Sequence, residues 1–211
     1  MKAVILLSGG MDSAICIALA IEQGFEPYLF HMSYGQRTEK RELKSVINLA
    51  KHYGLNHPER VLIVTDRTIS YIGGNAITDR NIPVPTDGEI IGVPATFVPF
   101  RNAILLSYAV TWAQVIEAEA IYFGVVDGER SRYPDCHKEF IESYQLAVDA
   151  GIPDNRIQII TPLYYDTKRE AYECALRLNV PLELTWSCYQ NENEPCGKCE
   201  SCMARAKAMD L

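Results

Sequence analysis

The sequence predicts an α/β protein with a doubly wound, five-stranded parallel sheet and a cysteine-rich knuckle near its C-terminal end. Apolar runs of strand length alternate with segments whose apolar residues recur every three or four positions, and a glycine turn follows the first run. Four of the seven cysteines crowd into residues 188–202. Strands that alternate with helices imply right-handed crossovers and a parallel sheet covered on both faces. We expect a sheet domain over residues 1–180 and a knuckle segment, residues 181–211, packed on it.

The apolar pattern places each element in turn. Buried strands are expected at 3–7, 26–32, 60–65, 120–126 and 157–161. The expected helices lie near 12–23, 38–53, 102–117, 137–150 and 167–178. Residues 70–100, where Gly, Pro, Asp and Asn recur without a helical period, predict a long functional loop. Ligands of doubly wound sheets bind beyond the carboxyl ends of the strands, so we expect the loops after Leu7, Met32 and Val126 to line a site.

Composition narrows the classes of function. No apolar stretch in the 211 residues approaches the roughly 20 needed to span a bilayer, and the N-terminal run AVILL is too short for a signal peptide. We therefore expect a cytoplasmic protein that does not enter a membrane. A net charge of −7 argues against a broad nucleic-acid footprint, because affinity for phosphate backbones comes mainly from Lys and Arg.

The first turn, in LLSGGMDSAICIAL at 6–19, has the features of an anion site. Gly9 and Gly10 let the backbone approach a ligand closely, and the amides of the first helical turn have no partners within the helix. The alternative is an ordinary strand-to-helix turn in which Ser8 or Asp12 caps the helix. The chain contains neither the G-x-x-x-x-G-K-[ST] nor the G-x-G-x-x-G motif, which excludes two other phosphate-binding loops.

The cysteine cluster predicts a metal site. Three cysteines have the spacing C-x-x-C-x-x-C, and a fourth precedes them, so we expect one structural Zn²⁺ to be bound by Cys188, Cys196, Cys199 and Cys202. A redox C-x-x-C or an iron–sulfur cluster is the alternative. Cys16 and Cys174 are interpreted as core residues. Cys136 stands at a predicted helix start, where it is either a packing residue or a nucleophile with a lowered pKa.

Several basic residues stand near the predicted strand ends. Arg37 and Arg101 open helices, with Asn102 beside the second of them, and Lys168 starts the last long helix. Solvated surface cations are the commonest fate of such residues. Their convergence on one crevice instead favours neutralisation of a charged ligand, so we expect both guanidinium groups to face the crevice.

The segment SGGMDS at 8–13 resembles the SGGxDS pyrophosphate-binding loop of the PP-loop ATP pyrophosphatases, which have a Rossmann-like fold of the HUP type. A longer series follows in order over essentially the whole chain: YGQR at 34–37, FVPFRN at 97–102, RYPDC at 132–136, TPL at 161–163, WSCY at 186–189 and CGKCESC at 196–202. As a set, these motifs are similar to those of the 7-cyano-7-deazaguanine synthase (QueC) family.

The resemblance implies an ATP-dependent C–N ligase of the queuosine pathway that releases AMP and pyrophosphate. Its substrates would be 7-carboxy-7-deazaguanine, ammonia and ATP with Mg²⁺. The carboxylate attacks the α-phosphorus of ATP, ammonia displaces AMP to give an amide, and a second adenylation of the amide oxygen permits loss of AMP to form the nitrile. A homodimer is also expected.

In this interpretation the candidate site residues fall into three groups. The cofactor-binding residues are expected to be Leu7, Ser8, Gly9, Gly10, Met11, Asp12, Ser13, His31 and Arg37. The catalytic residues are expected to be Asp12, Arg101 and Lys168, since adenylyl transfer depends mainly on positioning and charge stabilisation. The expected substrate-binding residues are Phe97, Arg101, Asn102, Tyr133 and Asp135. A carboxylate such as that of Asp135 accepts paired hydrogen bonds from a guanine-type N–H edge.

The chain also departs from the family pattern. Phe100 stands where many relatives have a small residue, and ERSRYPDC at 129–136 replaces DYSGYPDC. Glu129, Arg130 and Arg132 thus stand in a loop expected to border the base. Two alternatives follow. One is a QueC-like ligase that joins the deazaguanine carboxylate as an amide to another amine, such as that of a protein attracted by the two arginines. The other is a nucleotide-binding sensor without catalysis.

Overall fold

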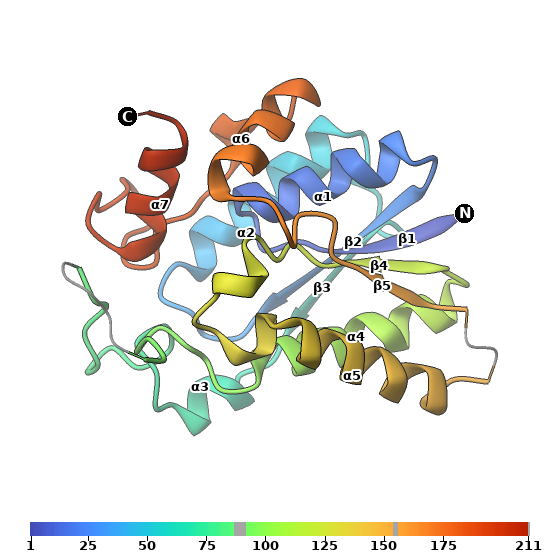
Figure 1. Ribbon diagram of the computed structural model, residues 1–211, viewed down its shortest axis with the longest axis horizontal. Helices are drawn as coiled ribbons and strands as arrows, with labels where there is room; N and C mark the ends of the chain where they lie inside the picture. Colours follow the sequence, from blue (N-terminus) through green and yellow to red (C-terminus); the bar gives the residue numbers. More distant parts are fainter. Residues whose placement is uncertain (87–91, 154–155, 211) are drawn as a thin grey trace.

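A computed structural model describes residues 1–86, 92–153 and 156–210. Its core is a parallel sheet of five strands in the order β3-β2-β1-β4-β5 (Figure 1). The strands are β1 (Lys2–Leu6), β2 (Glu26–Ser33), β3 (Val61–Thr65), β4 (Ala120–Tyr122) and β5 (Gln158–Ile160). Each lies within or beside a strand predicted from the sequence, so the predicted doubly wound sheet is confirmed.

Helices cover both faces of the sheet (Figure 1). The α-helices are α1 (Met11–Glu22), α2 (Glu39–His52), α3 (Thr68–Ile72), α4 (Arg101–Val115), α5 (Lys138–Gly151), α6 (Lys168–Arg177) and α7 (Glu200–Ala208). Short 3₁₀ turns span Gly128–Arg130, Pro134–Cys136 and Leu182–Leu184. The alternation of β1 shows the two-sided burial: Ala3 and Ile5 pack with α1, α2 and α6, whereas Val4 and Leu6 pack with α4 and α5.

The chain reverses the direction of sheet growth between β1 and β4, which lie side by side. Such a switch point opens a crevice at the carboxyl ends of the two strands. Strand β4 ends at Tyr122 and not at the predicted residue 126. The cause is Gly124, where a Cβ atom would lie 3.1 Å from the backbone of Asp12 and of Ser13. The chain must leave the ladder there to pass the start of α1.

Two helices were not predicted. Helix α3 occupies the first residues of the predicted loop, 70–72, and α7 begins directly after Cys199, contains Cys202 and lies beyond the carboxyl ends of the strands (Figure 1). After α3, the described parts of the predicted loop, residues 73–86 and 92–100, contain no helix or strand; residues 87–91 lie outside the described residues. Within the described ranges, no helix is both long and apolar enough to cross a membrane.

Candidate active site

A cavity of about 270 Å³ opens at the switch point, between the carboxyl ends of the strands and the C-terminal segment. Its wall contains most of the expected site residues: Leu7, Ser8, Gly10, Met11, Asp12, Ser13, His31, Arg101, Asn102 and Lys168. The remaining expected residues lie outside this lining: Gly9, Arg37, Phe97, Tyr133 and Asp135. The loops after β1, β2 and β4 therefore converge as the topology requires.

The glycine turn leaves the start of α1 open to a ligand. Gly10 is the N-cap residue, and no side chain among the described residues caps the helix. The Ser8 hydroxyl instead accepts a hydrogen bond from the Gly10 amide at 3.2 Å and lies 3.1 Å from the Ser13 hydroxyl. The free amides of the first turn and the helix dipole thus form an anion-binding end of the cavity.

Asp12 and Lys168 face each other across this end. The Lys168 ammonium donates to both carboxylate oxygens of Asp12 at 2.6 Å. A capping box places the lysine, because Thr167 caps α6 by accepting from the Glu170 amide while the Glu170 carboxylate accepts from the Thr167 amide. Lys168 is then the first helical residue, and its side chain reaches from α6 to α1.

His31 links the first two strands beneath the cavity. Its side chain is only 2% exposed, and its Nδ1 lies 2.9 Å from the Leu7 carbonyl oxygen. Burial lowers the pKa of the imidazole. A neutral ring that donates to Leu7 fits this position, which makes His31 a buried polar contact in the cavity floor.

Two polar residues of the cavity wall, Tyr34 and Glu42, were not predicted from the sequence. Arg101 donates to the Tyr34 hydroxyl at 3.1 Å, and Glu42 lines the same cavity. Burial raises the pKa of Glu42. The motif YGQR, followed by Glu39 and Glu42, could have indicated a glutamate in the cavity wall. Nothing in the sequence, however, showed which of these two glutamates faces the cavity.

Asp135 does not line the cavity, contrary to its expected position beside the substrate. Its Oδ2 accepts from the Asn102 amide at 3.1 Å, and the Asn102 side chain donates to the Asp135 carbonyl and to the Cys136 sulfur. The carboxylate thus closes the N-terminal turn of α4. Burial raises the pKa of Cys136 to about 11, so this thiol stays protonated at neutral pH and fits the packing interpretation.

Arg37 is turned away from the crevice, so the expectation that its guanidinium faces the crevice is wrong. It donates to the carbonyl oxygens of Ala76, Asp79 and Ile82 at 2.6 to 2.8 Å. Carbonyl groups in a loop without regular structure need donors, and the fork of an arginine supplies several at once. Arg37 therefore holds the long loop against the start of α2.

Phe97 and Tyr133 pack beside the cavity, with ring centroids 6.2 Å apart. The Tyr133 hydroxyl lies 2.8 Å from the Thr96 hydroxyl and donates to the Glu200 carboxylate at 3.3 Å. Tyr133 thus joins the long loop to α7, and Phe97, a residue of that loop, packs against the Tyr133 ring.

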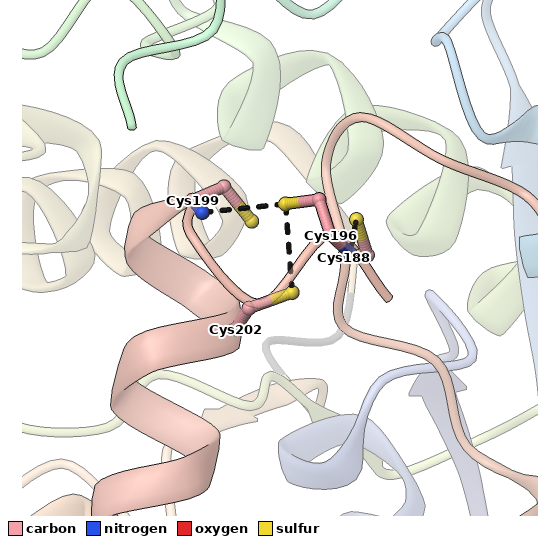
Figure 2. A group of neighbouring side chains, drawn as sticks. All are labelled: Cys188, Cys196, Cys199 and Cys202. Carbon is pink, nitrogen blue, oxygen red and sulfur yellow. Dashed lines mark hydrogen bonds between the residues drawn. The ribbon is translucent and has the colours of Figure 1, made fainter. Parts of the chain in front are cut away.

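The four cysteines of the C-terminal segment form one cluster (Figure 2). Their sulfur atoms all lie within 4.8 Å of one another, and those of Cys196 and Cys202 are 4.0 Å apart. Tetrahedral zinc with Zn–S bonds of about 2.3 Å needs sulfurs about 3.8 Å apart, so a small contraction would fit the ion. The Cys188 sulfur accepts from three backbone amides, those of Gln190, Asn191 and Cys196, which hold it in the cluster.

The cysteine segment also forms a wall of the cavity. Trp186, Ser187, Tyr189 and Ser201 line it. The Trp186 amide donates to the Gly9 carbonyl at 2.8 Å, and the Arg41 guanidinium lies 4.5 Å from the centre of the Trp186 ring. The knuckle and the glycine turn are thus joined directly, although they are about 180 residues apart in the sequence.

Comparison with known proteins decides the family. A family model described as "Queuosine biosynthesis protein QueC" matches residues 2–211. The chain belongs to the QueC family. The 7-cyano-7-deazaguanine synthase of Nautilia profundicola is 46% identical over 99% of this chain and 93% of its own length. The enzyme of the same name from Koribacter versatilis is 46% identical over 99% and 89%, respectively.

The fold extends beyond QueC proteins. A solved 4-thiouridine synthetase–RNA complex with bound ATP aligns with 99% of this chain and 50% of its own, with a TM-score of 0.53 and 17% identity. At this identity the likeness concerns the fold alone, and it agrees with the PP-loop type of sheet predicted from SGGMDS.

The positions that depart from the QueC pattern lie outside the lining of the cavity. Phe100 has a left-handed backbone with φ of 56°, a conformation that favours glycine, and its side chain is 64% exposed. Arg130 pairs with Asp127 at 2.8 Å, and Arg132 pairs with Glu200 of α7. Each arginine of the altered loop is thus matched by an acid of the same chain.

Proposed function

We propose that this protein converts 7-carboxy-7-deazaguanine and ammonia to 7-cyano-7-deazaguanine at the expense of ATP, as a step of the queuosine pathway. One observation carries the proposal: in a chain of the QueC family, a single cavity joins the glycine turn and the Asp12–Lys168 pair to a polar wall suited to a heterocycle. An ATP phosphate and a second substrate can meet there without a change of site.

The reaction has the two adenylations that the resemblance implies. In the first, a carboxylate oxygen attacks the α-phosphorus and pyrophosphate leaves, after which ammonia displaces AMP to give the amide. In the second, the amide oxygen attacks the α-phosphorus of another ATP and pyrophosphate leaves, and loss of AMP and of both N–H protons then gives the nitrile. In each step negative charge develops on the phosphate oxygens. Hydrogen-bond donors held near those oxygens would stabilise this charge and so accelerate the reaction.

The residues of the cavity match these needs. The amides of residues 11–13 and the Ser8 and Ser13 hydroxyls would hold phosphate, and Lys168 and Arg101 would offset the charge that develops on it. Asp12 would hold Mg²⁺ beside the glycine turn, and the ion would offset negative charge on the phosphate groups. Lys168 would then be able to pair with phosphate.

Zinc would have a structural role in this scheme. A closed set of four cysteines leaves no coordination position for a substrate, and the ion would fix residues 181–211 against the sheet domain, residues 1–180. Through Trp186 the knuckle would hold both the glycine turn and one wall of the cavity. We also propose that the protein is cytoplasmic and forms a homodimer.

The chief alternative is a ligase that joins the activated carboxylate to an amine of another protein. Its sequence basis was the extra positive charge of Arg130 and Arg132. Both side chains pair with acids of this chain, which leaves less charge to attract an acidic partner and favours the nitrile. A non-catalytic sensor would bind ATP without releasing pyrophosphate.

Mass spectrometry of the products tests the proposal. The purified protein is incubated with 7-carboxy-7-deazaguanine, ATP, Mg²⁺ and ammonium, with and without a lysate of the source organism. Accumulation of the free nitrile is expected in both samples. An amide adduct that forms only with lysate would favour the conjugating ligase, and bound ATP without pyrophosphate would favour the sensor.

A further inference from the structure

The lining of the cavity contains two acidic residues, Asp12 and Glu42, and their hydrogen-bond partners differ. Both oxygens of Asp12 accept from Lys168. The hydrogen-bond partners of Glu42 among the described residues are uncharged: Thr38 donates to Oε1 at 2.6 Å and Gln36 donates to Oε2 at 2.9 Å. Within the described residues Glu42 thus forms no salt bridge, whereas Asp12 pairs with Lys168.

The two donors hold the Glu42 carboxylate in one orientation. Gln36 and Thr38 are themselves buried, with 4% and 2% of their surface exposed. The Gln36 oxygen accepts from the Tyr34 amide at 2.8 Å, which fixes its amide so that the nitrogen faces Glu42. A carboxylate has about four acceptor positions and two are used here, so each oxygen can accept one more hydrogen bond.

Unpartnered donors lie in the same wall. The indole N–H of Trp186 and the Nε–H of Arg101 are buried, and neither has a hydrogen-bond partner among the residues that the structure describes. Trp186 is 7% exposed and lines the cavity, as Arg101 does. Buried donors in native proteins are nearly always satisfied, so an ordered water or a ligand that carries acceptors would complete these two.

We propose that Glu42 recognises the heterocycle of the substrate, by accepting hydrogen bonds from the ring N–H and the exocyclic amine of the deazaguanine. These two donors are adjacent and parallel in a guanine-type ring, which matches the two oxygens of a carboxylate. Trp186 and Arg101 would donate to the ring carbonyl or the carboxylate of the same ligand. This inference rests on the proposed function and assigns to Glu42 the role first expected of Asp135.

The variant Glu42→Gln tests it, because glutamine presents an N–H₂ where the ligand needs an acceptor. We expect the Kd for 7-carboxy-7-deazaguanine, measured by calorimetry, to rise roughly 10- to 100-fold. The Kd for ATP and the zinc content should not change. Glu39→Gln is the matched control, since Glu39 lies on the same helix, accepts from the Gly35 amide at 2.9 Å and pairs with Arg67 outside the cavity.

An analogue without the exocyclic amine separates recognition from a merely structural role. The unaltered protein should bind this analogue at least tenfold more weakly, and Glu42→Gln should bind both compounds about equally. Equal binding of both by the unaltered protein would overturn the inference even if the variant did not fold, as would full discrimination by the variant. If the unaltered protein neither binds nor converts 7-carboxy-7-deazaguanine, the proposed function itself fails; if it converts it while Glu42→Gln keeps the same affinity, only the role of Glu42 fails.

Discussion

At the scale of single residues, Gly9 is required both by its backbone and by the space around it. Its φ is +86°, and a Cβ atom would lie 2.8 Å from the Glu42 carbonyl oxygen and 3.0 Å from the Ser45 Cβ. Gly24 has nearly the same φ, +81°, but a Cβ atom there would meet nothing within 4 Å. A comparison of substitutions at the two glycines therefore distinguishes the effect of backbone strain, present at both, from the effect of steric crowding, present only at Gly9.

Gly9→Ala should therefore cost more stability than Gly24→Ala and should also impair ATP binding. Strain alone is worth about 1–3 kcal/mol at such positions, and the clash adds to it only at Gly9. We expect Gly9→Ala to weaken ATP binding at least tenfold while Gly24→Ala leaves it unchanged. Denaturant unfolding and calorimetry measure the two effects. Normal ATP affinity in Gly9→Ala would contradict the role of the turn.

Glu42 should make stability depend on pH in a defined direction. Burial raises its pKa in the folded protein above the value in the unfolded chain. As pH rises between these two values, the unfolded chain loses its proton first and folding stability falls. Glu42→Gln cannot titrate. As the pH rises above the ordinary pKa of a glutamate carboxyl group, the unliganded variant should thus gain stability relative to the unaltered protein, and a difference independent of pH would refute this.

The sequence predicted which residues belong to the site better than it predicted whether their side chains point into the cavity. The glycine turn, Asp12 and Lys168 follow from position, because a strand end and a helix start determine where they point. Arg37 and Glu42 do not. The side chain of Arg37 is oriented by its hydrogen bonds to carbonyl groups of residues 76–82. That of Glu42 is oriented by its hydrogen bonds from Gln36 and Thr38. Such contacts depend on loop geometry, which leaves no periodic pattern in the sequence.

At the scale of elements, the strands and long helices were predictable because burial leaves a period in the sequence. The exceptions have local causes. Strand β4 stops early where Gly124 passes α1, and α7 is a nine-residue helix whose apolar content is mostly cysteine and alanine. Its position is set by the cysteine cluster and by Arg205, which donates to Thr185, Ser187 and Leu182. Tertiary contacts of this kind override weak local patterns.

The coupling of the knuckle to the glycine turn predicts the effect of losing one cysteine. Cys199→Ser should abolish the binding of one zinc equivalent and lower the free energy of unfolding by several kcal/mol. Because Trp186 joins the knuckle to Gly9, the KM for ATP should rise as well. Cys174→Ser, on α6 and outside the cluster, is the control. Metal analysis that finds iron, or zinc retained in Cys199→Ser, would contradict the assignment.

At the scale of the whole molecule, the topology explains why one chain can bring two substrates together. The switch point between β1 and β4 supplies the phosphate end of the cavity, and the C-terminal segment returns from α6 to close the other side. A sheet alone would leave that side open to water. The knuckle thus completes the reaction chamber of the proposed synthase, and its loss should affect both substrates.

The fate of the carboxylate oxygens tests the proposed chemistry most directly. The protein is supplied with 7-carboxy-7-deazaguanine that carries ¹⁸O in both carboxylate positions, and the nucleotides are analysed by mass spectrometry. Two successive adenylations require two AMP molecules for each nitrile, each with one ¹⁸O, and unlabelled pyrophosphate. Label in inorganic phosphate with release of ADP, or AMP without label, would contradict attack of the carboxylate on the α-phosphorus.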